Sequence, residues 1–282
     1  MKKILYSALI CLSVATLSTK VASANEFDQL EKENSTTVGV YGINTESGKE
    51  IKHHSDERFG YASTFKAIAS GVLLNNYTEK EINKKIQIQQ KDIVAYSPVT
   101  EKYVGKQMTL KALIEAAMLK SDNTANNYII GEIGGISSFK AALQHLGDHV
   151  SDPQRLEPNL NNYDPTNTAD TTTPRAAAHT LNELLTSNQM DTKNLKLLKR
   201  VMIENETGDQ LIKAGVPNHY LVGDKSGQGT TYATRNDIAF IYPKKGDKPI
   251  ILAVYTKKDD KEGTPDDKVI AKAAQIAIKQ IE

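Results

Sequence analysis

Strand-like segments lie near both ends of this 282-residue chain, whereas its middle has helical periodicity. Residues 37–43 are rich in β-branched and aromatic side chains, and residues 232–242 and 250–256 have the same character. Between residues 61 and 205, apolar side chains recur at helical spacing, for example in 110–118. Such a chain must build its sheet from both ends. We therefore predict an α/β (α+β) fold, in which an antiparallel sheet from the N- and C-terminal segments is flanked by helices and carries an inserted all-α domain.

The same pattern predicts how the chain is divided. We expect an α/β domain from residues 25–60 and 206–282, and an all-α domain from residues 61–205. The all-α domain includes a loop at 152–170, which is either a surface excursion or, given its length, a functional segment. A cleft between the two domains is the expected site. Near the C-terminus, Thr264 is expected to cap a helix whose first turn contains Pro265.

The first 24 residues are predicted to be a signal peptide that is cleaved after Ala24. Two lysines precede a mostly apolar run at residues 4–17, and Ala22-Ser23-Ala24 fits a cleavage site. The run is shorter than the roughly 20 residues that span a membrane, although an uncleaved anchor is the alternative. We expect a secreted protein, extracellular or periplasmic, with no membrane span after cleavage. Because Cys11 would leave with the signal, the rest of the chain depends on its core and not on disulfides.

Charge and motif content argue against several classes of function. The net charge is +1 and would become −2 without the three lysines of the first 24 residues, so nothing indicates nucleic-acid binding. No nucleotide-binding glycine motif is present, so we expect no cofactor. The histidines form no H-x-H or H-E-x-x-H pair, so we expect surface or loop histidines and no metal site. The six histidines are His53, His54, His145, His149, His179 and His219.

Three short motifs follow one another in the chain: Ser63-Thr64-Phe65-Lys66, Ser121-Asp122-Asn123 and Lys225-Ser226-Gly227. In a helix that begins at Ser63, Lys66 shares its face, so the amine can contact the hydroxyl and activate a poor nucleophile. The backbone N–H groups of Ser63 and Gln228 would form an oxyanion hole. The alternative is an N-cap serine beside a solvent-facing lysine. That alternative suits the isolated match Ser137-Ser138-Phe139-Lys140, which has the character of a helix start.

The second motif follows an apolar helix. It is either a turn between helices, since all three residues favour turns, or a source of two functional groups. In the functional interpretation, Ser121 donates a proton to a leaving nitrogen, and Asn123 hydrogen-bonds an amide of the substrate.

The third motif lies in an expected strand at residues 220–228. Lys225 and Ser226 offer a charge and a hydrogen-bond donor to an anionic group, and Arg235 is expected to bind the same carboxylate bidentately. Because Gly227 has no side chain, we expect it to let a substrate lie close against the strand.

Together these motifs resemble those of class A serine β-lactamases, in particular the secreted Gram-positive (staphylococcal-type) penicillinases. The similarity covers essentially the whole chain after residue 24 and includes residues 92–98, 121–127 and 232–237. It implies a β-lactamase/transpeptidase-like fold and hydrolysis of the β-lactam amide bond of penicillin-type antibiotics, which gives antibiotic resistance. It also implies a small-molecule β-lactam substrate, no cofactor, no metal and a monomeric protein.

The resemblance also assigns roles to residues. Ser63 would form the acyl-enzyme, and Glu157, with Asn161, would activate the water that hydrolyses it. Whether Lys66 or Glu157 accepts the first proton stays open. The implied residues are Ser63, Lys66, Ser121 and Glu157 for catalysis; Tyr96, Asn123, Asn161, Lys225, Ser226, Gly227, Gln228 and Arg235 for substrate binding; and, for structural support, Asn127 under the Glu157 loop and the pair Arg155 and Asp170.

Two related functions are the alternatives. A penicillin-binding D-Ala-D-Ala peptidase or a β-lactam sensor would form the acyl-enzyme and stop there. Glu157 argues against the peptidase. A sensor is usually tethered to a membrane helix, and the sequence shows no apolar span after the signal. The peptide bond after this glutamate is typically cis in the family, and a cis bond before proline costs only about 0.5–1 kcal/mol. We therefore predict a cis Glu157–Pro158 bond. Gly229 stands where some relatives carry alanine, a difference expected to affect substrate range.

Overall fold

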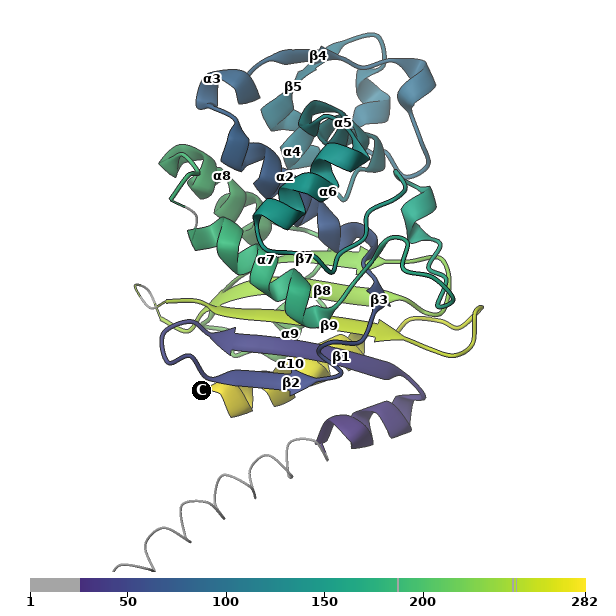
Figure 1. The fold of residues 1–282 in the computed structure, drawn as a ribbon, viewed down its shortest axis with the longest axis vertical. Helices are drawn as coiled ribbons and strands as arrows, with labels where there is room; N and C mark the ends of the chain where they lie inside the picture. Colours follow the sequence, from purple (N-terminus) through teal and green to yellow (C-terminus); the bar gives the residue numbers. More distant parts are fainter. Residues whose placement is uncertain (1–25, 187, 245, 247) are drawn as a thin grey trace, which may run out of the picture.

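One antiparallel five-stranded sheet forms a layer of the molecule, with strand order β2-β1-β9-β8-β7 (Figure 1). The computed structural model describes residues 26–282 except 187, 245 and 247, so the predicted signal peptide and its cleavage site lie outside the described residues. The strands are β1 Thr37–Asn44, β2 Glu50–His53, β7 Leu221–Gln228, β8 Arg235–Tyr242 and β9 Ile250–Lys257. Both ends of the chain contribute to the sheet, which confirms the predicted fold class.

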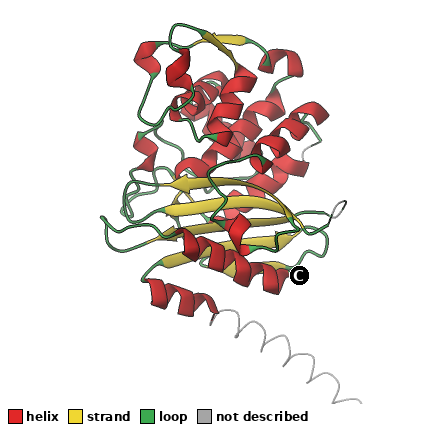
Figure 2. Cartoon of the chain, turned by 180° about the vertical axis from the view of Figure 1, so that it is seen from behind, coloured by secondary structure: helices red, strands yellow, loops and turns green. Residues whose placement is uncertain are grey.

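Helices cover both faces of the sheet. On one face, α7 packs on β1 and β9 and α8 packs on β7, and the inserted helices α4, α5 and α6 lie further from the sheet (Figure 1). The opposite face carries α10 and, nearby, a helix at residues 26–34 that the sequence analysis did not predict (Figure 2). The helices are α2 Phe65–Asn76, α3 Glu79–Ile82, α4 Leu110–Leu119, α5 Asn123–Ile133, α6 Ile136–His145, α7 Pro174–Thr186, α8 Thr192–Ile203, α9 Ile212–Gly215 and α10 Asp267–Ile281.

Side-chain alternation along the central strands produces two hydrophobic cores. Ile251, Ala253 and Tyr255 of β9 pack in the core that includes the inserted helices, whereas Leu252 and Val254 pack in the core that includes α10. Neighbouring side chains of a strand point to opposite faces. The sheet therefore separates the two cores and contributes side chains to both, which fixes the position of the inserted helices relative to β7 and β8.

The start of α10 differs from the prediction. The helix begins at Asp267, and its N-cap is Asp266, whose side chain accepts a hydrogen bond from the Lys268 N–H at 2.9 Å. The prediction of Thr264 as the cap was wrong by two residues, because Asp266 is an equally suitable cap closer to the apolar helix face.

Two short ladders lie outside the main sheet. β3 Phe59–Gly60 pairs with β6 Thr171–Thr172, and β4 Lys85–Gln87 pairs with β5 Gln107–Thr109. The first ladder joins the segment that leads to Ser63 with the segment that follows the 152–170 loop. It therefore holds that loop beside the start of α2.

Candidate active site

Ser63 lies in a tight turn between β3 and α2. Residues Ala62–Thr64 form a 3₁₀ helix, in place of the first α-helical turn that the sequence predicted. Ala62 has a positive φ of 45°, which is uncommon for a residue other than glycine. Asn236 on β8 stabilises the turn by donating from Nδ2 to the carbonyl oxygens of Gly60 and Tyr61, at 2.7 and 3.3 Å. Sequence reasoning gave Asn236 no role, because its partners are backbone atoms far away in the chain.

Gly227 makes room for this turn. A Cβ atom at residue 227 would lie 2.9 Å from Thr64 N and 3.1 Å from Ser63 N, which is too close for an undisturbed structure. The backbone of the turn fills the space that a side chain at residue 227 would take, while Gly227 itself lines the cleft. The consequence is that β7 packs directly against the turn that carries Ser63. The expectation that Gly227 lets a substrate lie close against the strand stays a prediction.

Lys66 and Glu157 form a buried ion pair beneath Ser63. Lys66 Nζ lies 3.0 Å from Glu157 Oε1, and it donates to Asn123 Oδ1 at 2.6 Å and to the Ser121 carbonyl at 2.7 Å. Burial lowers the pKa of Lys66, and the Glu157 carboxylate opposes that shift. Ser63 Oγ donates to Glu157 Oε1 at 3.5 Å. Among the described residues, Glu157 therefore links Ser63 with Lys66. The sequence had predicted that Ser63 and Lys66 would contact each other directly.

Ser121 lies between two buried lysines. Its Oγ is 3.4 Å from Lys66 Nζ and 3.3 Å from Lys225 Nζ. Burial and the charge of Lys66 lower the pKa of Lys225 to about 7. Lys225 also donates to the Ser226 carbonyl at 2.9 Å, and the Ser226 hydroxyl lies 2.6 Å from Thr207 Oγ1. Thr207 belongs to no motif, and the sequence carried no signal for it.

Asp122, the middle residue of the second motif, organises the loop in front of the site. It is fully buried, and its carboxylate accepts from the N–H groups of Val99 and Thr100, both at 2.9 Å. The Asn123 N–H donates to the Tyr96 carbonyl at 3.0 Å. Tyr96 is 63% exposed, which places it at the rim, as predicted for a residue that lines the cleft.

The segment that carries Glu157 is held from two sides. Asn127 Nδ2 donates to the Glu157 carbonyl at 2.9 Å, and the Glu157 N–H donates to Asn127 Oδ1 at 3.0 Å. Asn161 Nδ2 donates to Glu157 Oε2 at 2.5 Å, while Asn161 Oδ1 is buried and has no hydrogen-bond partner among the described residues. The Glu157–Pro158 bond is cis, which confirms that prediction.

Arg155 and Asp170 close the loop. Arg155 Nε forms an ion pair with Asp170 Oδ2, as the sequence analysis expected. The other carboxylate oxygen of Asp170 accepts from the Tyr61 hydroxyl at 2.9 Å and from the Arg155 N–H at 3.0 Å. Because Tyr61 precedes the Ser63 turn, the loop and the turn share one buried carboxylate.

Arg235 is already paired. Its Nε and Nη2 donate to the two carboxylate oxygens of Asp267, at 2.6 and 3.2 Å, and its Nη1 lies 3.5 Å from the Gly227 carbonyl. The edge of the guanidinium that carries Nε is thus occupied by Asp267, and only the Nη1 side is turned toward β7. The sequence analysis did not identify Asp267, which lies 32 residues further along the chain.

These elements enclose a cleft of about 480 Å³. A larger groove of about 970 Å³ lies along α2, α6 and α7, but it contains none of the motif residues. The predicted residues that line the cleft are Ser63, Tyr96, Ser121, Asn123, Asn161, Ser226, Gly227, Gln228 and Arg235. Lining residues that the sequence analysis missed are Ala95, Pro158, Thr207 and Thr230. Lys66, Glu157 and Lys225 lie just beneath its wall, buried.

The beta-lactamase enzyme family matches residues 22–281. The chain belongs to this family. It is 40% identical to a beta-lactamase of Bacillus licheniformis over 95% of this chain and 86% of the relative, and 42% identical to beta-lactamase 1 of Bacillus cereus over 92% and 83%. Among solved structures, the class A beta-lactamase of Clostridium kluyveri superposes with a TM-score of 0.89 at 40% identity, covering 92% of this chain and 98% of that one.

Membership of the beta-lactamase family confirms the resemblance stated from the motifs. The match in fold extends to a halotolerant bacterial beta-lactamase, with a TM-score of 0.88 and 38% identity. The antiparallel sheet with inserted helices is therefore the class A beta-lactamase fold. The residues that this family member brings around the cleft lie far apart along the chain.

Proposed function

We propose that this chain hydrolyses the β-lactam amide bond of penicillin-type antibiotics through an acyl-enzyme on Ser63, and so confers antibiotic resistance. The position of Glu157 carries the proposal: Oε1 lies 3.5 Å from Ser63 Oγ, and Oε2 accepts from Asn161. A base beside the nucleophile allows water to release the acyl group, which a penicillin-binding peptidase or a sensor does not achieve. The names of the relatives support the same substrate class.

Acylation begins when Ser63 Oγ bonds to the β-lactam carbonyl carbon. The serine proton passes to a buried base, and the hydrogen bond from Ser63 Oγ to Glu157 Oε1 favours Glu157 over Lys66 as the first acceptor. The carbonyl oxygen gains negative charge and is stabilised by the backbone N–H groups of Ser63 and Gln228. Collapse of this tetrahedral species re-forms the carbonyl and breaks the C–N bond of the ring.

The leaving nitrogen takes its proton from Ser121 Oγ. Lys66 and Lys225 both lie within 3.4 Å of that oxygen, so either ammonium can return a proton to Ser121. Two lysines with lowered pKa values suit this role, because each releases a proton more readily than an exposed lysine does. The ring-opened product stays attached to Ser63 through an ester.

Deacylation uses water and Glu157. Lys66, after giving its own proton to Ser121, takes the serine proton from Glu157 at 3.0 Å, so that Glu157 is again a carboxylate. The carboxylate then removes a proton from the water, the water oxygen bonds to the ester carbon, and the bond from that carbon to Ser63 Oγ breaks as Glu157 returns the proton to the serine. Asn161 Nδ2 already binds Glu157, whereas the unpartnered buried Oδ1 of Asn161 suits an acceptor for the second hydrogen of that water. The product is the free penicilloic-type acid.

Substrate orientation is assigned to the third motif and its neighbours. We assign the substrate carboxylate to Lys225, Ser226 and the Nη1 side of Arg235, and the substrate side-chain amide to Asn123. Charge-assisted hydrogen bonds to a carboxylate are short and directional, so they fix the ring relative to Ser63.

Location and division of the chain belong to the same proposal. Among the described residues, no helix has the length and hydrophobicity needed to cross a membrane. We assign residues 1–24 as a signal peptide that is cleaved after Ala24, which gives a secreted monomer. The α/β domain then comprises residues 25–60 and 206–282, and the all-α domain comprises residues 61–205.

Stopped-flow hydrolysis of a chromogenic β-lactam tests the proposal with Glu157→Gln. The substitution keeps the size of the side chain and removes the base. Without the Glu157 charge, burial acts unopposed on the pKa of Lys66 and favours its neutral amine, which can accept the serine proton. We therefore expect a burst of about one equivalent, followed by turnover that is slower by about 10²–10⁴-fold, because no group replaces Glu157 in activating the water. Ser63→Ala should abolish both phases, and Glu262→Gln, at an exposed glutamate, should match the unaltered protein. Unchanged steady-state turnover in Glu157→Gln would show that another group activates the water.

A further inference from the structure

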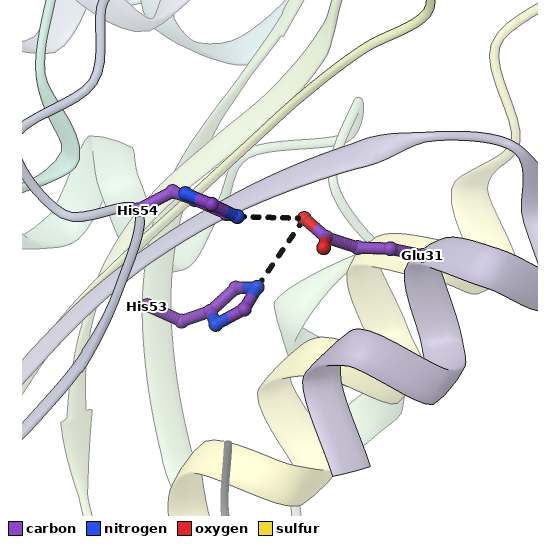
Figure 3. A group of neighbouring side chains, drawn as sticks. All are labelled: Glu31, His53 and His54. Atoms are coloured by element: carbon purple, nitrogen blue, oxygen red, sulfur yellow. Dashed lines mark ion pairs between the residues drawn. The ribbon is translucent and has the colours of Figure 1, made fainter. Parts of the chain in front are cut away.

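Glu31, His53 and His54 converge at a place remote from the cleft (Figure 3). Glu31 belongs to the helix at residues 26–34, and the two histidines lie at the end of β2. Glu31 Oε1 is 3.2 Å from His53 Nε2 and 3.5 Å from His54 Nε2. The three ligand atoms all lie within 4.8 Å of one another. Figure 3 shows both imidazole rings directed at the same carboxylate.

The backbone creates this convergence. In a regular strand, consecutive side chains point to opposite faces, so two adjacent histidines would be separated by the sheet. His54 has a φ of 42°, in the left-handed region, which turns its ring to the side of His53. A residue other than glycine rarely adopts this conformation, and such strained positions concentrate at functional sites.

His53 Nε2 lacks a satisfactory partner. The His53 side chain is only 8% exposed, and its Nε2 makes no hydrogen bond of acceptable geometry among the described residues, despite its distance to Glu31. Its ring stacks on Phe27 at 4.9 Å between centroids, which fixes the direction of the nitrogen. Glu31 Oε1 is held by the Val38 N–H at 2.7 Å. A buried imidazole nitrogen that faces an anchored carboxylate without a hydrogen bond of acceptable geometry is suited to share a cation with that carboxylate.

We propose that Glu31, His53 and His54 bind a divalent transition-metal cation of the zinc type. Bonds of about 2.0–2.1 Å in a tetrahedral zinc site place neighbouring ligand atoms about 3.3 Å apart. The distances of 3.2 and 3.5 Å from the Glu31 oxygen to the two imidazole nitrogens agree with that spacing. Imidazole and carboxylate ligands favour zinc, nickel or copper over magnesium and calcium. Water would complete the coordination.

A second carboxylate supports the assignment. His54 Nδ1 lies 3.4 Å from Glu57 Oε2, on the side of the ring opposite Nε2. A carboxylate at Nδ1 fixes the tautomer in which Nε2 is free to bind a metal. Glu57 is in turn paired with Lys257 at 2.7 Å. The His54 side chain is 42% exposed, which gives the cation a route from solvent.

The position of the cluster indicates a structural role. β2 and β7 form the two edges of the sheet, separated by three strands, so the cation lies far from Ser63. It would join the helix at residues 26–34 to the end of β2, and so tie the beginning of the described chain to the sheet. Because only the folded chain brings Glu31 to the histidines, binding should raise stability and leave hydrolysis unchanged.

Isothermal titration with zinc chloride tests the proposal on untagged protein, purified after export and stripped with a chelator. We expect one zinc ion per chain and a rise in Tm of several degrees at a hundredfold excess over Kd. Cobalt bound at the same site should give visible d–d absorption bands typical of tetrahedral coordination. His54→Asn removes an imidazole with a residue that tolerates the left-handed backbone, and Glu31→Gln removes the carboxylate charge.

The variants decide between a built site and adventitious binding. We expect His54→Asn and Glu31→Gln to weaken zinc binding at least about tenfold and to remove the Tm rise, with unchanged β-lactam turnover. The matched control is His145→Asn on α6, an exposed histidine outside the cluster, which should bind zinc as the unaltered protein does. Equal zinc binding in His54→Asn, loss of binding in His145→Asn, or no binding to the unaltered protein would each overturn the proposal.

Discussion

Replacing Asp237 by asparagine should increasingly stabilise the folded protein as the pH rises. Asp237 on β8 and Asp224 on β7 are diagonal neighbours across the ladder, and both are buried. Burial, followed by the charge of Asp224, raises the pKa of Asp237 well above 3.8. Burial also raises the pKa of Asp224 to about 6. The folded protein therefore holds protons that the unfolded chain has already released.

The sign of the effect follows from the direction of these shifts. A carboxyl whose pKa is raised on folding contributes full stability below its unfolded pKa of 3.8, and that contribution is lost as the pH rises. While Asp237 keeps its proton in the folded state, each pH unit above this value removes about 1.4 kcal/mol. Asparagine resembles the protonated carboxyl in shape and does not titrate. The free energy of unfolding of Asp237→Asn minus that of the unaltered protein should therefore increase by up to about 3 kcal/mol from pH 5 to pH 7.

Urea unfolding at pH 5, 6 and 7, followed by circular dichroism and by tyrosine fluorescence, measures this difference. The asparagine Oδ1 can still accept the Ile212 N–H that now binds Asp237 Oδ2 at 3.0 Å, so folding should be preserved. Asp259→Asn, at an exposed position, should show no pH-dependent difference. A constant difference between Asp237→Asn and the unaltered protein across the three pH values would refute the argument, because it would mean that Asp237 is ionised in the folded state.

Two further predictions concern the cleft. Gly227→Ala should lower kcat/KM of β-lactam hydrolysis and destabilise the fold by about 1–3 kcal/mol, because the added Cβ would lie 2.9 Å from Thr64 N; steady-state kinetics and thermal unfolding would expose the error if both stayed unchanged. Because the pKa of Lys225 is about 7 and a substrate carboxylate needs its charged form, kcat/KM should fall by up to about tenfold per pH unit above 7. If kcat/KM of the unaltered protein stayed constant up to pH 9, the role of Lys225 would be contradicted. If the decline above pH 7 disappeared in Lys225→Arg, whose charge does not titrate in this range, the role would be supported.

The fold was predictable because the sequence pattern acts at short range. Apolar periodicity in residues 110–118 corresponds to α4, and the β-branched runs correspond to β1, β8 and β9. Where two solutions have similar local energies, the prediction failed. Thr264 and Asp266 can both cap a helix, and packing of the apolar face on the sheet decides between them. The helix at residues 26–34 directly follows the predicted signal peptide, and the sequence analysis did not recognise it as a separate element.

The motifs located the chemical groups but not their contacts. Ser63 and Lys66 were expected to touch because both are on one helix, yet a 3₁₀ turn precedes α2 and Glu157 lies between them. Asn236 and Asp267 act on residues that are distant in sequence, through the backbone in one case and Arg235 in the other. Such pairings depend on which strands are neighbours, and spacing along the chain does not encode them. The same reason explains why two adjacent histidines gave no indication of Glu31.

The buried charged side chains of the cleft are explained by their role in catalysis and not by a contribution to stability. Lys66, Glu157 and Lys225 are nearly or completely inaccessible to solvent, and well-packed apolar residues in place of such a group are often neutral or stabilising. Burial lowers the pKa values of both lysines, and the charge of Lys66 lowers that of Lys225 further until an anion arrives. A substrate carboxylate supplies that anion, so binding itself restores the charge on Lys225 and couples recognition of the substrate to the proton supply at Ser121.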